Sequence, residues 1–537
     1  MLTSSVAPLA VAVLSVVLLS ILWTQRARRS HLPPGPPPLP ILGNLLDIPR
    51  KLCVADYQPL ADKYGDVVYL NAVTQSIVVL GTYAGASELL DKRSSRYSDR
   101  PSLVMASLIG GDWLIPYSGY TDLWRQRRKR FHEFFSATAI REYAHAQEVG
   151  ARALVRLLLS TPENYFDNVE FAFGSTIFSS VYGIDISSPN DEYLVMADEV
   201  MRIIKEAYTP GKFLVEVFPW MRHVPAWLPG MSFKRKAAEW SILLQEMRNK
   251  AFDAAFDKAR RGDISPCVLT AILDKGSNQR QLSEDEEALA RDVCGVAYLG
   301  ASQGSSSTFF TFLYAMALHP DVQRRAQAEI DIVVGRSRLP LMSDRPALPY
   351  IDALVNECLR WMPTAQLGVP HRSMADDEYN GYLIPKGTLV LTNTRAIGRS
   401  KEHYVDPDEF RPERFLKDGQ LNRDILSPRA YAFGFGRRIC PGMHFGEASL
   451  FITIASVLHA LTIRPGLDEH GRPSLPSSED VPMKDGFLTY VSLRPRKAST
   501  YVLCADTPKY LATCSRRGLE PTVVTVGART SIEDTRS

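Results

Sequence analysis

The stretch AFGFGRRICPGMHFGEAS, from Ala432 to Ser449, sets a single cysteine, Cys440, among glycines and arginines. Arg437 and Arg438 precede the thiol, Gly442 follows it, and no second cysteine lies nearby. Four roles suit such a thiol: one half of a disulfide, a buried apolar side chain, a nucleophile or a metal ligand. The rest of the chain decides among them.

The other cysteines argue against a disulfide framework and against a zinc site. The seven cysteines are odd in number and scattered, and none has CxxC spacing: Cys53, Cys267, Cys294, Cys358, Cys440, Cys504 and Cys514. This pattern favours a reducing compartment for the folded part of the chain. The net charge of +3 is too close to neutral to indicate a nucleic-acid partner.

The chain is long enough to bury a large core, since it has 537 residues of which 45% are hydrophobic. At about 100–200 residues per domain, this length suggests three or four domains. No Gly/Ser linker, low-complexity run or internal repeat divides the middle of the sequence, so one large fold is equally consistent with it.

The N-terminus predicts a membrane anchor. Nearly every residue from Val6 to Trp23 is apolar, and the basic run Gln25–Arg29 follows at once. About 18 residues is the short end of a membrane span. A cleaved signal peptide is the alternative, but the basic residues follow the apolar run and no clear small-x-small site is present. We therefore predict an uncleaved signal anchor at residues 1–25, with the rest of the chain facing the cytosol.

A basic and proline-rich hinge at residues 26–44 follows the anchor. It contains LPPGPPPLPILGN, from Leu32 to Asn44. Because proline fixes φ and blocks helix formation, this segment is predicted to be a semi-rigid spacer between anchor and body. A ligand for an SH3 domain is the alternative interpretation.

The body of the chain is predicted to be mainly α with a minor β portion. Apolar runs at 67–70 and 77–80 predict a short hairpin sheet. From about residue 120 to 360 the pattern is mostly helical, interrupted by loops such as 219–229, and after about 365 it changes to short strands and loops. A helix is predicted to resume after Pro441.

One long helix is predicted in the middle of the body. Ser283 and Glu286 form a capping box, with further acidic residues at the favourable end of the helix dipole. The apolar pattern runs to Leu318, where His319 and Pro320 end it. A helix of roughly 35 residues spans about 50 Å, enough to cross the whole molecule.

Four polar signatures lie far apart along the chain. They are Trp124-Arg125-Gln126-Arg127-Arg128, Glu357-Cys358-Leu359-Arg360, Phe410-Arg411-Pro412-Glu413-Arg414-Phe415, and the pattern F-x-x-G-x-R-x-C-x-G formed by Phe433, Gly436, Arg438, Cys440 and Gly442. Taken singly, the first three have ordinary explanations as an exposed basic face or nucleic-acid contact, a solvated helix pair and a polar turn. Five fixed positions at ~5% usage each coincide by chance about once in several million windows. Together and in this order, the four patterns exclude chance.

With these motifs the chain resembles a cytochrome P450, a heme-thiolate protein. The resemblance runs from the anchor to about Arg496 and implies the cytochrome P450 fold for a catalytic domain at residues 45–497. The segments PHRSMADDEYNGYLIPKGT and RPERF are most similar to fungal, microsomal members of secondary metabolism. No motif of the family falls in residues 498–537, which we predict to be a disordered tail.

The resemblance implies heme b as the cofactor, with Cys440 as the ligand of its iron. A thiolate ligand donates electron density to the iron, and positive surroundings favour the thiolate. Phe433 belongs to the same cofactor-binding loop, where Gly436 and Gly442 are expected to allow tight turning and close approach of backbone N–H groups. The resemblance assigns the heme propionates to Trp124, Arg128, His371 and Arg438.

The resemblance also implies roles for two further sets of charged residues. Glu357, Arg360 and Arg414 are expected to form a buried charge network that braces the heme loop. Arg125, Arg127, Lys129 and Arg130 are expected on the surface, where they would steer an acidic, flavin-containing reductase.

One departure from the family concerns proton delivery. In the family the long central helix carries an acid followed by threonine, and here Gln303 and Gly304 stand in their places. Ser305 is the first candidate for the missing hydroxyl, directly or through an ordered water. A hydroxyl on the substrate is the second, and chemistry without ordinary oxygen scission is the third. Serines 305–307 as plain helix-packing residues remain a further alternative.

The sequence therefore predicts a monooxygenase that inserts one atom of O2 into a lipophilic small molecule, with electrons from NADPH through NADPH-cytochrome P450 reductase. NADPH and flavins belong to that partner. The expected location is the endoplasmic reticulum membrane, with a single span and a cytosolic catalytic domain. The alternatives are rearrangement, dehydration or desaturation without net oxygen insertion, and a heme-binding protein with impaired catalysis.

Overall fold

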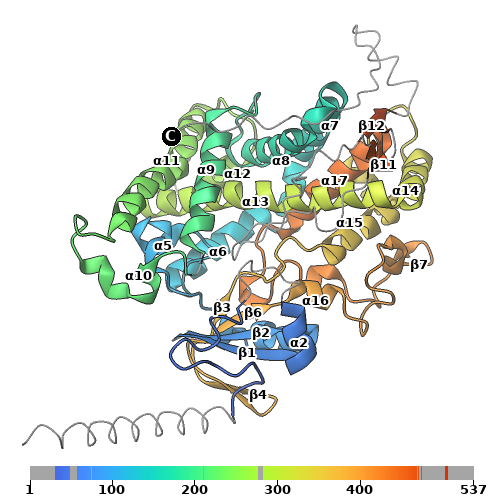
Figure 1. Ribbon diagram of the computed structural model, residues 1–537. Helices are drawn as coiled ribbons and strands as arrows, with labels where there is room; N and C mark the ends of the chain where they lie inside the picture. The colour runs from blue at the N-terminus through green and yellow to red at the C-terminus, as the bar shows by residue number, and fades with distance from the viewer. Residues whose placement is uncertain are drawn as a thin grey trace, which may run out of the picture.

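The structure, a computed structural model, describes residues 31–48, 57–73, 75–209, 211–275, 282–467, 470, 473–474 and 502–505. Helices dominate these residues, as predicted (Figure 1). The longer ones are α6 (Asp122–Phe135), α7 (Ala144–Ser160), α8 (Tyr165–Tyr182), α9 (Glu192–Ala207), α11 (Ser232–Arg261), α13 (Glu284–Leu318), α14 (Pro320–Val333), α15 (Pro349–Trp361) and α17 (Met443–Ala460). The shorter ones are α2 (Gln58–Tyr64), α3 (Tyr83–Ala86), α4 (Ser94–Tyr97), α5 (Val104–Leu108), α10 (Leu214–Val217), α12 (Val268–Asp274) and α16 (Thr394–Gly398).

A small mixed sheet forms the opposite end of the molecule from α7, α8 and α12 (Figure 1). Its strands are β1 (Val67–Ala72), β2 (Gln75–Leu80), β6 (Leu389–Thr392) and β3 (His371–Arg372), in the order β1-β2-β6-β3. The predicted hairpin is confirmed as the antiparallel pair β1–β2, and β2 pairs in parallel with β6. Two-stranded pairs are β4 (Asp377–Tyr379) with β5 (Tyr382–Ile384), β7 (Leu416–Lys417) with β8 (Gln420–Leu421), and β10 (Gly466–Leu467) with β11 (Pro473–Ser474).

Helix α13 is the long helix that the sequence predicts, with the capping box of Ser283 and Glu286 at its start. It crosses the middle of the molecule and contacts α6, α8, α11, α15 and α17 (Figure 1). Its first half packs into one apolar cluster, with Val293 and Leu299, and its second half into another, with Phe309 and Met316. The small and polar stretch 300–308 separates these halves, so the centre of α13 is left for a site rather than for core packing.

Part of the proline-rich hinge docks on β1, and its role as a semi-rigid spacer stays a prediction. The carbonyl of Pro34 accepts a hydrogen bond from the backbone N–H of Tyr69 (2.8 Å), and the side chain of Asn44 accepts one from Asn71 (3.0 Å). Proline lacks an N–H group but keeps its carbonyl, so the segment can still dock on β1. A Cβ atom on Gly35 would lie 1.9 Å from the carbonyl oxygen of Tyr69, which explains a glycine among the prolines.

Of the predicted N-terminal anchor and C-terminal tail, the structure describes only four residues of the tail. The anchor at residues 1–25 lies outside the described residues, and no helix within them has both the length and the apolar character needed to cross a membrane. In the predicted disordered tail, Val502–Ala505 forms strand β12, which pairs antiparallel with β9 (Leu461–Arg464). The tail prediction therefore needs correction at these four residues, because β9 offers an edge whose backbone groups they satisfy.

Candidate active site

A large cavity lies against the centre of α13. It is walled by α6, α13, the chain after α15 and the loop before α17. Most of its lining is apolar, and its polar members include Arg100, Trp124, Arg128, Ser305, Thr308, Thr364, His371, Arg438 and Cys440. A mostly apolar lining with a few polar side chains is typical of a pocket that binds a small molecule or a cofactor.

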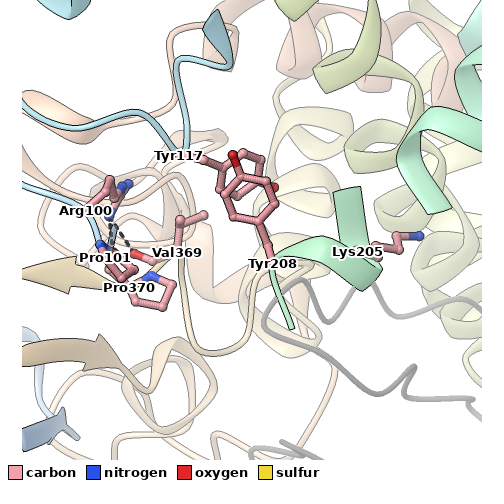
Figure 2. A pocket seen from close by; sticks show the side chains of 7 residues that line it. All are labelled: Arg100, Pro101, Tyr117, Lys205, Tyr208, Val369 and Pro370. Carbon is pink, nitrogen blue, oxygen red and sulfur yellow. Dashed lines mark hydrogen bonds between the residues drawn. The ribbon is translucent and has the colours of Figure 1, made fainter. Parts of the chain in front are cut away.

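A smaller pocket adjoins the large one and is shown in Figure 2. Arg100, Tyr117 and Val369 line both. The rings of Tyr117 and Tyr208 lie 4.3 Å apart between centroids, at 37° to each other. Because Tyr208 follows the last residue of α9, the smaller pocket extends the cavity toward that helix.

The loop before α17 presents Cys440 to the large cavity. The backbone N–H of Cys440 donates to the carbonyl of Phe433 (2.7 Å), which closes the loop, and both residues line the cavity. Gly436 has φ of 52°, and a Cβ atom there would lie 2.2 Å from the carbonyl oxygen of Leu90. Glycine is therefore required at position 436. Gly442 differs from expectation, since its φ is −93° and a Cβ atom would meet nothing within 4 Å.

The surroundings of the Cys440 sulfur suit a metal-bound thiolate. Cys440 has exposed surface toward the cavity, yet desolvation by the surrounding protein raises the pKa of its thiol, whereas the backbone N–H groups of Gly442 and Met443 and the charge of Arg128 lower it. These N–H groups lie at the start of α17, the end of a helix that favours negative charge. Desolvation disfavours a bare thiolate, and a bound metal cation would supply the stabilisation that is missing.

Arg128 and Arg438 bring positive charge to the same cavity. The guanidinium of Arg438 donates to the carbonyls of Ser98 (2.7 Å), Ile115 (3.1 Å) and Ser118 (2.9 Å). Burial, reinforced by the charge of Arg128, lowers the pKa of Arg438 to about 9, and burial also lowers the pKa of Arg128.

Arg100 is a third cation in the cavity, and sequence reasoning missed it. Its side chain is buried and donates to the carbonyls of Pro116, Val369 and Pro370, each at 2.8 Å. Burial and the charge of Arg438 lower its pKa. No local motif marks Arg100, because its environment is made by chain almost 270 residues away.

Trp124 and His371 complete the predicted set of cofactor contacts. The indole N–H of Trp124 donates to the carbonyl of Ile115 (3.0 Å), and its ring lies 4.0 Å below the guanidinium of Arg438. His371 Nδ1 lies 2.7 Å from the carbonyl of Tyr97, which can only accept, so Nδ1 carries a proton. Burial and the charge of Arg100 lower the pKa of His371. The ring is then neutral, and it donates to a propionate only after gaining a second proton.

The residues present fit heme b. Among the residues that the structure describes, none of Arg100, Arg128 and Arg438 forms an ion pair with a carboxylate. The charge of Asp99 acts on Arg100 and Arg438 without a direct contact, so the cavity holds an excess of positive charge. The two propionates of heme would balance it, since planar guanidinium groups bind carboxylates well. Cys440 would hold the iron from the loop. The structure thus brings Cys440, Phe433, Arg438, Arg128, Trp124 and His371 to one cavity.

The predicted charge network exists and is completely buried. Glu357 and Arg360 form a two-fold ion pair, with both contacts at 2.7 Å, and Arg414 Nε lies 3.2 Å from Glu357. The two arginines also donate to the carbonyls of Gly398, Val405, Asp406, Pro407 and Glu409. The network therefore fixes residues 398–414 directly. It reaches the chain before the Cys440 loop through Tyr404, whose ring lies under Arg360 and whose hydroxyl is 3.0 Å from that of Tyr431.

The centre of α13 leaves open space toward the cavity. A Cβ atom on Gly300 or Gly304 would meet nothing within 4 Å, and both glycines line the cavity. Ser305 is buried and also lines it, but its hydroxyl would lie 3.6 Å from a Cβ atom on Gly446 in α17. Ser305 thus faces the helix that follows Cys440. The side chain of Gln303 lies outside the described part of the chain.

The basic residues near Trp124 do not form one surface, which corrects the prediction. Arg127 is mostly buried, and its Nε lies 2.7 Å from Asp292, which also binds Arg248. This cluster joins α6, α11 and α13. Arg130 pairs with Glu133 (2.8 Å).

Arg125 and Lys129 are the members of the predicted set that remain exposed. Arg437 from the Cys440 loop joins them, because Arg125 and Arg437 both lie over the ring of Tyr120, at 5.2 Å and 5.6 Å.

The buried carboxyl of Glu447 is expected to make the stability of the fold depend on pH. It is buried on α17, with Oε1 2.8 Å from Arg429 Nε. Burial raises its pKa to about 7, although Arg429 and Arg345 oppose the shift. A carboxyl whose pKa is higher in the folded state stabilises the fold below its unfolded pKa, and this stability is lost as the pH rises through about 7. Between pH 5 and 8 we expect wild type to lose on the order of 3 kcal/mol relative to Glu447→Gln, which stays neutral.

Urea midpoints of wild type and Glu447→Gln at both pH values measure this difference. Glu402→Gln, a change at an exposed position of the same fold, is the control and is expected to follow wild type. Parallel pH curves for wild type and Glu447→Gln would show that Glu447 keeps its charge in the folded protein.

Comparisons with known proteins point to the same kind of protein as the residues of this cavity. The family model for cytochrome P450 matches residues 33–485. The cytochrome P450 monooxygenase COX2 of Coprinopsis cinerea is 38% identical over 91% of this chain and 92% of its own length. A cytochrome P450 monooxygenase of Armillaria gallica is 36% identical, over 93% of this chain and 99% of its own. The monooxygenase eriA of Hericium erinaceus is 40% identical, over 84% of this chain and 86% of its own.

Proposed function

Because the chain belongs to the cytochrome P450 family, we propose that it inserts one oxygen atom of O2 into a lipophilic small molecule of fungal secondary metabolism. The family itself makes the chain a heme-dependent monooxygenase that receives electrons from a redox partner. The apolar lining of the cavity supports a lipophilic substrate, and the fungal origin of the three relatives supports the biological setting.

One observation carries the proposal: the sulfur of Cys440 opens into a large apolar cavity that α13 crosses. The chemistry that heme supplies with a thiolate ligand is O2 activation, because the thiolate donates electron density and favours O–O cleavage. Cys440 would hold the iron, and the three cavity arginines would neutralise the propionates. Apolar residues such as Val296, Leu359 and Val369 bind the substrate and exclude water.

The test uses the full chain loaded with heme and supplied with NADPH, a fungal NADPH-cytochrome P450 reductase and candidate lipophilic substrates under isotopically labelled O2. We expect one labelled atom in each product molecule. Product without added oxygen would assign a rearrangement, dehydration or desaturation instead. NADPH consumption no faster than that of the reductase alone, with every substrate, would identify a heme-binding protein with impaired catalysis.

Restoring a hydroxyl at residue 304 is expected to improve coupling. Gly304 faces the cavity where the family has threonine, and a Cβ atom there has open space. A positioned proton donor contributes about 10²–10⁴-fold in typical enzymes. In Gly304→Thr we therefore expect the product formed per NADPH to rise by about twofold or more, with less hydrogen peroxide released. Product, NADPH and peroxide are counted in the same reaction.

The control is Gly304→Val, which has nearly the same shape as threonine without the hydroxyl. It is expected to leave coupling at or below the wild-type value. Equal coupling in wild type, Gly304→Thr and Gly304→Val would show that residue 304 takes no part in proton delivery.

The proposed redox partner is an acidic, flavin-containing reductase. Support comes from the exposed cations Arg125, Lys129 and Arg437, which lie on α6 and beside the Cys440 loop. Charge complementarity of this kind mainly raises the association rate and is weakened by salt. Reductase-supported NADPH consumption should accordingly fall as ionic strength rises.

The proposed location is the endoplasmic reticulum membrane, with one span and a cytosolic catalytic domain. The support is in the sequence, where the apolar run from Val6 to Trp23 precedes a basic stretch. The docking of residues 34–44 on β1 would then hold the sheet end of the molecule close to the anchor.

A further inference from the structure

We propose that the substrate carries a hydroxyl group, which donates a hydrogen bond to the paired side chains of Thr308 and Thr364 in the cavity wall. This inference rests on the proposed function, because it concerns the substrate of the same cavity. The lining of the cavity otherwise indicates only an apolar ligand, and the threonine pair specifies that this ligand is an alcohol.

The two threonines come from separate parts of the chain. Thr308 lies on α13, and Thr364 lies three residues beyond the end of α15. Both line the cavity, and their Oγ1 atoms are 3.1 Å apart. The Oγ1 atom of Thr308 also lies 3.2 Å from the carbonyl oxygen of Gly304. The pair thus places two hydroxyl groups beside the part of α13 that lacks a side chain.

The hydrogen bonds of the pair decide what it can bind. A hydroxyl has one proton to donate and two lone pairs to accept with. The carbonyl of Gly304 can only accept, so Thr308 donates to it, and Thr364 then donates to Thr308. Both protons are used within these two contacts, whereas lone pairs remain on both oxygens. The pair is therefore an acceptor, and a hydroxyl group on the substrate suits it better than a ketone or an ether.

Three other polar groups of the cavity make their hydrogen bonds to backbone carbonyls. The hydroxyl of Thr394 lies within hydrogen-bond distance of the carbonyl oxygens of Ala365 (2.7 Å) and Gln366 (2.8 Å), and its single proton is used there. His371 Nδ1 and the guanidinium of Arg100 are likewise held by carbonyls. A polar group in an apolar pocket fixes the orientation of a ligand. The Thr308–Thr364 pair gives this orientation to a molecule whose remaining surface is apolar.

The experiment measures binding, not turnover. The heme-loaded chain is titrated with cyclododecanol and cyclododecanone, two apolar rings of the same size that differ in one group. Dissociation constants come from the change in heme absorbance and from calorimetry. We expect the alcohol to bind about three- to tenfold more tightly than the ketone, the effect of one net neutral hydrogen bond. Thr364→Val and Thr308→Val should each bring the ratio close to one.

Two control variants guard against structural effects. Thr311→Val makes the same change on the same helix, at a buried threonine whose hydroxyl bonds to Ser307 O (3.2 Å) outside the cavity lining. It should keep the preference for the alcohol, as should Thr308→Ser, which retains the hydroxyl. Equal binding of alcohol and ketone by wild type, or an unchanged ratio in both valine variants, would overturn this proposal alone. A heme-loaded chain that binds neither ring nor any other apolar molecule would overturn the proposed function with it.

Discussion

Replacing Cys440 with alanine is expected to abolish heme-thiolate chemistry completely. Cys440 is the cysteine that lines the cavity, with its sulfur beside the N–H groups that open α17. Alanine leaves the loop closed by the backbone bond to Phe433 but removes the ligand. The red-shifted Soret maximum of the ferrous protein under carbon monoxide, which reports a thiolate ligand, should disappear, and NADPH-dependent product should fall below detection.

A second cysteine provides the control for this prediction. Cys294 is buried in α13 outside the cavity lining, and burial raises the pKa of its thiol. Cys294→Ala is expected to lower stability modestly, because a small core side chain is shortened, and to keep the red-shifted maximum. A Cys440→Ala protein that still shows this maximum would remove Cys440 as the ligand and leave the cavity without its assigned chemistry.

Local features of the sequence predicted the local structure well. The capping box of Ser283 and Glu286 begins α13, and Pro320 ends it, because both signals act on neighbouring backbone groups. Glu357 and Arg360 pair because residues three apart share a helix face. The loop around Cys440 was recognised from its glycines, of which Gly436 proves to be sterically required.

Contacts between distant parts of the chain could not be predicted in this way. Arg127 was expected on the surface, but its partner Asp292 lies 165 residues away, and burial follows from that pairing. The sequence does not predict Arg100 as a cavity residue, because the carbonyls of Val369 and Pro370 that bind its guanidinium lie far along the chain. The same holds for Thr308 and Thr364, which are 56 residues apart in sequence and 3.1 Å apart in space.

Position 304 in α13, where the family has threonine, involves both a local feature of the sequence and a contact between distant parts of the chain. The sequence identified Gly304 and offered Ser305 as a substitute. In the structure Ser305 lines the cavity and also lies against Gly446, and a hydroxyl pair lies one helical turn beyond Gly304. A hydroxyl one turn away lies on the same face of the helix, whereas the next residue is rotated by about 100°.

Replacing Glu357 with alanine is expected to destabilise the fold by about 3–5 kcal/mol. Glu357 and Arg360 have no exposed side-chain surface, and Glu357 also accepts a hydrogen bond from the backbone N–H of Arg411 (2.7 Å). Without the carboxylate, two buried guanidinium groups lose their counter-charge and keep only carbonyl partners. Urea and thermal midpoints measure the loss, and heme content per chain should fall with them.

Two comparisons show whether the effect comes from the buried charge. Glu402→Ala, at an exposed position, is expected to change stability by less than about 0.5 kcal/mol. Adding Arg360→Met to Glu357→Ala removes one of the stranded charges together with its partner, so the double variant should be more stable than Glu357→Ala alone. The opposite result would be a double variant whose loss of stability equals the sum of the losses in Glu357→Ala and Arg360→Met. In that case the contacts of Arg360 to the carbonyls of residues 398–409 hold this segment, and the ion pair with Glu357 is secondary.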